Sequence, residues 1–174
     1  MQEEFRPDYE AVKAFVTRKV GSLKSDMNTR DALCGMSDYV NLLHTVCLEA
    51  SGAQISFAAP VTTGAVLKAG DVVYNDLMTL YSYDNQLYVM KMTGKEIKDY
   101  LEHSYDGWIN TLDGKSETLL KMRNIFSSYN LDSAGGLVYE TDVTKPFGER
   151  VSIRSMADGS AFDMEAEYKV AMNS

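Results

Sequence analysis

Two short polar segments, far apart in the chain, combine residue types that bind a flat, polar ligand. YSYDNQ carries Tyr83 and Asn85, and SSYNLD carries Tyr129 followed by Asn130. An aromatic ring that stacks on a nucleobase contributes roughly 1 to 3 kcal/mol of binding free energy. An asparagine amide has both donors and an acceptor with which to read the edge of such a ring. The spacing alone leaves two interpretations open, a stacking platform or ordinary surface tyrosines in turns.

Histidines and cysteines, the usual metal ligands and nucleophiles, do not form a recognisable site. His44 and His103 fall in different predicted helices without the spacing of a zinc site, and we expect a satisfied core histidine and a surface histidine respectively. Cys47 is three residues from His44 on one helix face, where we expect a buried thiol. A Cys–His nucleophilic pair there would offer no substrate access and no oxyanion hole, and a disulfide between Cys34 and Cys47 stays undecided. We therefore assign no catalytic and no metal-binding residue to this chain.

The elements that would position the two polar segments are helices mixed with short strands. Apolar spacing predicts helices at 9–20, 38–50 and 74–81, and Ser37 can cap the second of them. A further helix begins at the capping box Thr93-Gly-Lys-Glu96. Alternation predicts strands at 54–58, 86–92, 137–143, 150–155 and 167–172, with Asp158-Gly159 as the hairpin turn before the last strand. We expect loops at 22–35, 61–70 and 106–121. This mixture indicates an α+β fold, a mixed β-sheet with packed helices.

The overall composition favours one globular domain spanning residues 1–174. The chain is 45% hydrophobic and 24% charged, and its net charge is -8. That charge argues against a nucleic acid polymer or an anionic membrane as partner. No apolar run is long enough to span a bilayer, and MQEEFRPDYE does not resemble a signal peptide. The chain stops at YKVAMNS, directly after a strand-like alternation, so we expect it to be a piece of a longer protein.

Four motifs in order carry a resemblance to a known family. They are SFAAP at 56–60, LYSYDNQL at 80–87, TGKEIKDYLE at 93–102, and the segment at 128–146 that begins SYNLD. Together they resemble the C-terminal domain of the 5'-nucleotidase family, and within it the 2',3'-cyclic-nucleotide 2'-phosphodiesterase/3'-nucleotidase branch. The resemblance covers the chain from about Val20 to its end.

The resemblance implies a two-domain enzyme of which this chain is the substrate-binding part. An N-terminal metallophosphatase domain, absent from this chain, would hold a divalent metal pair and the hydrolytic water. The C-terminal domain would stack the base of a nucleotide or nucleoside between two aromatic rings. Tyr83, with Asn85 beside it, matches the first ring, and Tyr129 matches the second. The resemblance further implies a role in nucleotide catabolism and a periplasmic, secreted or cell-surface location.

The sequence departs from the family pattern at the sugar and phosphate contacts. Many relatives have an arginine-bearing turn after the strand that here reads SFAAP, and this chain has no arginine there. Arg30 lies where the family often has a substrate-facing arginine, and it is a candidate on that ground. Gly135 occupies the position of an acid that holds the ribose hydroxyls in some relatives. The alternative hypothesis is a non-catalytic binding or interaction module that kept the fold and lost the nucleotide.

Overall fold

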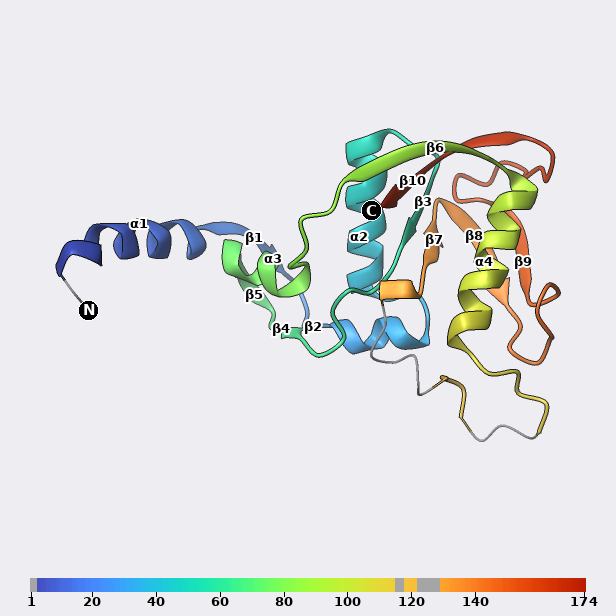
Figure 1. Cartoon of the computed structure of the whole chain (residues 1–174), viewed down its shortest axis with the longest axis horizontal. Coiled ribbons are helices and arrows are strands. Elements are labelled where there is room, and N and C mark those ends of the chain that lie inside the picture. The colour runs from blue at the N-terminus through green and yellow to red at the C-terminus, as the bar shows by residue number, and fades with distance from the viewer. Residues whose placement is uncertain (1–2, 115–117, 122–128) are drawn as a thin grey trace.

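A four-stranded mixed sheet forms the centre of the molecule in the computed structural model, which describes residues 3–114, 118–121 and 129–174 (Figure 1). In spatial order the strands are β6 (Leu87–Thr93), β10 (Glu167–Asn173), β3 (Ile55–Ala58) and β7 (Ser133–Gly135). β10 is parallel to β3 and antiparallel to β6, and β7 is antiparallel to β3. The sheet and its packed helices confirm the predicted α+β class.

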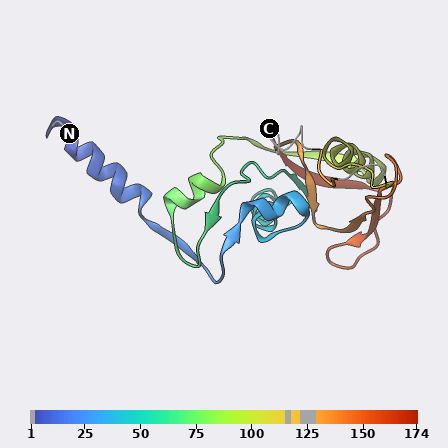
Figure 2. The same cartoon turned by 90° about the horizontal axis from the view of Figure 1, so that it is seen from below.

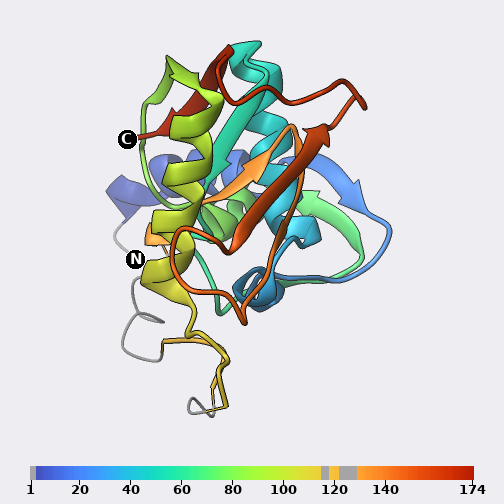
Figure 3. The same cartoon turned by 90° about the vertical axis from the view of Figure 1, so that its right-hand side faces the viewer.

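The two faces of the sheet are covered by different elements. Helix α2 (Asp38–Ser51) packs on one face, and helix α4 (Gly94–Trp108) packs on the other beside the hairpin of β8 (Leu137–Thr141) and β9 (Val151–Met156) (Figures 1 and 3). Successive side chains of β3 point alternately to the α4 face and to the α2 face of the sheet. Ile55 and Phe57 join the core that contains Leu101 of α4, whereas Ser56 reaches His44 of α2.

Both covering helices begin where the sequence predicts them to begin. The Ser37 hydroxyl accepts a hydrogen bond from the Val40 amide at 3.4 Å at the start of α2. At the start of α4, the Thr93 amide donates to Glu96 Oε2 at 2.7 Å and the Glu96 amide donates to Thr93 Oγ1 at 3.2 Å. This reciprocal pair is the predicted capping box.

The N-terminal part of the chain forms smaller sheets beside the central one. α1 (Arg6–Val16), which follows the short 3-10 helix η1 (Glu3–Phe5), extends from the body as an arm (Figures 1 and 2). β1 (Lys19–Leu23) pairs with β5 (Gly70–Val73), and β2 (Met27–Asn28) pairs with β4 (Val66–Leu67). The 3-10 helix η2 (Thr29–Cys34) and helix α3 (Tyr74–Leu80) complete this part. None of the helices in the described residues is long and apolar enough to cross a membrane.

The predicted first helix at 9–20 is wrong at its C-terminal end. α1 ends at Val16, and Lys19–Leu23 is strand β1, with Gly21 at an irregularity in its pairing with β5 instead of at a helix stop. Pairing with a distant strand overrides the local helical spacing there. The predicted loops at 22–35 and 61–70 likewise contain the short strands β2 and β4, and α4 continues to Trp108, past the predicted loop boundary.

The predicted hairpin between the last two strands is also wrong. β9 pairs with β8, whereas β10 pairs with β6 and β3. The turn at Asp158-Gly159 does form, because the Gly159 amide donates to the Met156 carbonyl at 3.1 Å and Gly159 has a φ of 86°. After this turn the chain continues to β10, which lies in the central sheet and does not pair with β9. A local turn signal therefore did not determine which strands pair.

Candidate functional site

Strand order brings the two predicted aromatic segments to the same end of the central sheet. The start of β6 lies opposite the end of β10, because Leu87 pairs with Asn173. The end of β10 lies beside the end of β3, and Ala58 at the end of β3 pairs with Ser133 at the start of β7. The residues just before β6 and just before β7 are consequently neighbours in space. These are the segments that carry Tyr83 and Tyr129.

A cavity of about 470 Å³ lies at this end of the sheet. Tyr83, Asn85 and Tyr129 all line it, so three of the four predicted substrate residues come together. Tyr83 and Tyr129 are 53% and 56% exposed as whole residues, so neither side chain is sealed in the core. The other lining residues are Phe57, Ala58, Ala59, Val61, Tyr81, Tyr100, Asn130, Asp132, Met172, Asn173 and Ser174.

The Tyr83 side of the cavity is organised around the hydroxyl of Tyr81. This hydroxyl accepts hydrogen bonds from Asn85 Nδ2 at 2.9 Å and from Asn173 Nδ2 at 3.0 Å. The Tyr81 ring meets the Tyr83 ring edge-on, with centroids 6.4 Å apart. Burial raises the pKa of Tyr81, so its hydroxyl stays neutral. These contacts fix the position of the Asn85 amide beside Tyr83.

The Tyr129 side of the cavity is organised around Asp132. The Tyr100 hydroxyl donates to Asp132 Oδ2 at 2.6 Å, and the Ser104 hydroxyl donates to the Asp132 carbonyl at 2.8 Å. The Tyr100 ring stacks on Phe57 with centroids 4.4 Å apart, which ties this corner to β3. Burial raises the pKa of Asp132, and the hydrogen bond from Tyr100 opposes that effect. The pKa of Tyr100 is also raised, by burial and then by the Asp132 charge.

A buried histidine joins the two strands behind the cavity. His44 Nδ1 is 2.8 Å from the Ser56 hydroxyl of β3, and His44 Nε2 is 3.0 Å from the Ser133 hydroxyl of β7. Burial lowers the pKa of His44 to about 4, so the ring is neutral near pH 7. This is the satisfied core histidine that the sequence predicts. Both ring nitrogens are used, and the buried Cys47 thiol points to Asn173 Oδ1 at 3.8 Å, which excludes a Cys–His nucleophilic pair here.

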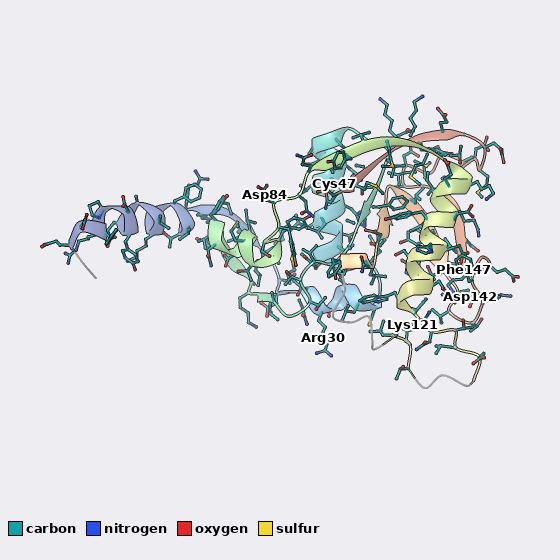
Figure 4. All side chains as sticks on the ribbon, in the orientation of Figure 1. Arg30, Cys47, Asp84, Lys121, Asp142 and Phe147 are labelled. Carbon is teal, nitrogen blue, oxygen red and sulfur yellow. The ribbon has the colours of Figure 1, made fainter. Side chains whose placement is uncertain are left out.

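The remaining histidine, cysteine and arginine candidates from the sequence all lie outside the cavity or in its surroundings without lining it. His103 is exposed, as expected, and Cys34 and Cys47 are both free thiols. Arg30 lies in η2, is exposed, and points away from the body, whereas Asp84, next to Tyr83, lies in the segment between α3 and β6 (Figure 4). Arg30 does not line the cavity, and its role in substrate binding stays a sequence-based prediction.

Two features of the site bear on sugar and metal contacts. A Cβ atom built on Gly135 would lie 2.6 Å from His44 Cβ and 2.8 Å from Ser56 Oγ, so the core leaves no room for a side chain at this position. Within the described ranges, no group of three or more His, Cys, Asp or Glu side chains could hold a metal ion. The described residues do not fit a metal pair, and no catalytic step is assigned to them.

Sequence reasoning missed four lining residues that shape the site. Tyr81 and Asp132 stand in the same two quoted segments as Tyr83 and Tyr129, so their spacing was a usable signal. Tyr100 and Asn173 belong to α4 and β10, and only the three-dimensional pairing brings them here. Part of the second motif, Ser127 and Ser128, lies outside the described residues.

Comparison with known proteins identifies the family. A family model described as "5'-nucleotidase, C-terminal domain" matches residues 16–174. The chain belongs to this family. The 2',3'-cyclic-nucleotide 2'-phosphodiesterase/3'-nucleotidase of Salmonella typhimurium is 27% identical over 203 residues, a match that covers 97% of this chain and 31% of that protein. The trifunctional nucleotide phosphoesterase protein YfkN of Bacillus subtilis is 42% identical over 83 residues, which cover 46% of this chain and 6% of that protein.

Solved structures agree with the predicted fold of this 5'-nucleotidase C-terminal domain. A putative 5'-nucleotidase from Staphylococcus aureus superposes with a TM-score of 0.77 at 22% identity, over 99% of this chain and 34% of that one. The 5'-nucleotidase precursor from Thermus thermophilus gives a TM-score of 0.68 at 23% identity, over 99% of this chain and 32% of that one. The chain therefore spans about a third of the length of these proteins and of the Salmonella relative.

Proposed function

We propose that this chain is the nucleobase-binding, substrate-specificity domain of a nucleotidase or cyclic-nucleotide phosphodiesterase, with Tyr83 and Tyr129 as the two stacking rings. The observation that carries the proposal is their meeting, from distant parts of the chain, in one cavity where both residues are exposed and Asn85 lies beside them. Base stacking is tolerant of sequence and of base identity, since every base has an aromatic face. Asn85 then contributes hydrogen bonds to the edge of the base.

The hydrolytic step belongs, in this proposal, to an N-terminal metallophosphatase domain outside this chain. That domain would supply the divalent metal pair, and the parent protein would be a phosphoric ester hydrolase in nucleotide catabolism. Support comes from the names of the relatives and from the share of their length that this chain spans. We place the parent protein in the periplasm or outside the cell on the same family grounds.

Nucleoside binding by the intact chain tests the stacking role. Tyr83→Ala and Tyr129→Ala should each weaken binding of adenosine, followed by NMR titration, by roughly 1 to 3 kcal/mol because one ring face is lost. Tyr83→Phe and Tyr129→Phe should bind almost as well as the wild type, because the ring stacks and the hydroxyl does not. Tyr9→Ala, which removes an exposed tyrosine of α1, is the matched control.

The competing function is a binding or interaction module that has lost the nucleotide. Gly135, which leaves no room for the acid of some relatives, favours this alternative. In that case neither Tyr83→Ala nor Tyr129→Ala would alter adenosine affinity beyond the Tyr9→Ala control, whatever their effect on the melting temperature. That result would contradict the stacking role.

A further inference from the structure

Among the described residues that line the candidate cavity, Asp132 is the one with a carboxylic acid side chain. Asp132 lines the cavity of Tyr83 and Tyr129, and it also lines a neighbouring cavity of about 420 Å³ on the α4 side. It thus stands in the wall between two spaces. A buried carboxylate with a purely structural role usually accepts hydrogen bonds through its oxygens from protein or water.

The two carboxylate oxygens of Asp132 have different surroundings. Oδ2 accepts the hydrogen bond from the Tyr100 hydroxyl at 2.6 Å. No described residue donates a hydrogen bond to Oδ1. An ionised carboxylate is an acceptor only, so the unpartnered oxygen of this cavity-lining residue offers one defined kind of interaction to a ligand. Tyr100 is itself fixed by stacking on Phe57, so the carboxylate is held in place before a ligand arrives.

A second polar side chain beside the stacking rings, Asn85, also leaves an acceptor free. Asn85 donates through Nδ2 to Tyr81, which leaves its Oδ1 without a donor among the described residues. Asn173 uses its amide in the same way, and its Oδ1 receives the Cys47 thiol. The side chains around the cavity therefore leave acceptors free on both sides, at Asn85 and at Asp132. A ligand that satisfies them must present N–H or O–H donors.

We propose that Asp132 is a specificity-determining residue that accepts a hydrogen bond from an N–H or O–H donor of the bound nucleoside. The inference rests on the proposed stacking function and deepens it, because stacking alone does not select among bases or sugars. Two groups of adenosine supply such donors, the exocyclic amine of the base and the ribose hydroxyls. Both present the same chemistry to Oδ1, and ligand analogues that lack one or the other distinguish them.

The test measures binding of three ligands to the intact chain by NMR titration: adenosine, purine riboside, which lacks the amine, and 2',3'-dideoxyadenosine, which lacks the 2' and 3' hydroxyls. Asp132→Asn should weaken adenosine binding roughly tenfold or more, since hydrogen bonds to a charged acceptor are among the stronger ones. For the analogue that lacks the donor in question, wild type and Asp132→Asn should bind equally. The identity of that analogue tells whether the amine or the hydroxyls meet Asp132.

Two further variants separate recognition from structure. Asp84→Asn removes an exposed acid of the neighbouring segment that does not line the cavity, and it should leave all three affinities unchanged. Tyr100→Phe removes the donor to Oδ2 and keeps the carboxylate, so the ligand selectivity of the wild type should persist. Near-UV circular dichroism of each variant confirms that the fold is retained.

Three results would overturn the inference. Unchanged adenosine affinity in Asp132→Asn would show that the charged acceptor of Asp132 contributes nothing to binding, against the proposal. An equal loss for all three ligands would show that Asp132 acts only through the position of Tyr100. The stacking proposal would survive either of these results, because the alanine variants of Tyr83 and Tyr129 would still lose adenosine affinity. The third result is failure of the wild type to bind any of the three nucleosides, which would contradict both proposals.

Discussion

Protonation of His44 should make the stability of the domain fall steeply below neutral pH. The ring is buried between Ser56 and Ser133, and burial lowers its pKa from the ordinary 6.5 to about 4. The unfolded chain therefore binds a proton on His44 at a pH where the folded chain does not. Stability contributed by the neutral ring is complete above pH 6.5 and is lost as the pH falls toward 4.

The size of the effect follows from the two pKa values of His44. A difference of one in pKa corresponds to about 1.36 kcal/mol, so the full loss is about 3 kcal/mol once the pH has fallen below both values. Between pH 7.5 and pH 5.0, most of the unfolded chains and few of the folded ones gain the proton. The expected loss of unfolding free energy over this interval is about 2 kcal/mol. That is a large share of the stability of an ordinary domain.

Urea unfolding at pH 7.5 and pH 5.0, followed by the fluorescence of Trp108, measures this loss in the wild type and in His44→Gln. Glutamine does not titrate and keeps an amide beside the serines. All other titratable groups are shared by the two proteins, so their contributions cancel in the comparison. We expect the wild type to lose about 2 kcal/mol more than the variant. An equal loss in the two proteins would refute the assignment of a buried neutral histidine.

Two more predictions concern the packing that supports the site. Glu102, 1% exposed, accepts the backbone N–H of Gly148, in the β8–β9 connection, and that of Val151, at the start of β9. Glu102→Gln should lower the unfolding free energy by about 1 to 3 kcal/mol, because an amide nitrogen replaces one acceptor. An unchanged urea midpoint would contradict this role. Gly136→Ala should lower the unfolding free energy by about 2 kcal/mol or more, because the φ of Gly136 is 85° and a Cβ atom there would lie 2.2 Å from the Gln54 carbonyl oxygen. Gly159→Ala is the control: Gly159 has a φ of 86° but open space around it, so the loss should be only about 1 kcal/mol. Equal urea midpoints for the two alanine variants would show that the close approach at Gly136 is relieved without cost.

Local signals in the sequence predicted the elements that are stabilised locally. The Ser37 cap and the Thr93–Glu96 capping box mark the starts of α2 and α4, and the structure confirms both. The apolar face of α2, including His44, was also readable, because a helix that packs on a sheet must bury one stripe. These features depend on residues within a few positions of each other.

Features that depend on distant pairing could not be read in this way. β1 begins at Lys19, within the predicted helix at 9–20, and its residues pair with β5, which lies much further along the chain at Gly70–Val73. β9 and β10 flank a good turn, but β9 pairs with β8 and β10 enters the central sheet. Register and partner choice in a sheet are decided by burial across the whole fold. The same reason hid Tyr100 and Asn173 from the sequence reading of the site.

The last strand, β10, shows how long-range pairing positions a locally readable segment, because β10 holds the Tyr83 side of the cavity in place. The Ser174 amide donates to the Gln86 carbonyl at 2.9 Å, the Gln86 amide donates to the Ser174 hydroxyl at 3.1 Å, and Asn173 bonds the Tyr81 hydroxyl. The segment that carries Tyr83 is thus held to the end of β10, whereas Tyr129 precedes β7 at the far side of β3. Neighbouring strands lie about 4.8 Å apart, so the strand order β10-β3-β7 sets how widely the two tyrosine segments are separated. Side-chain types in two loops make stacking possible, and the insertion of β10 between β6 and β3 places those loops on the two sides of one cavity.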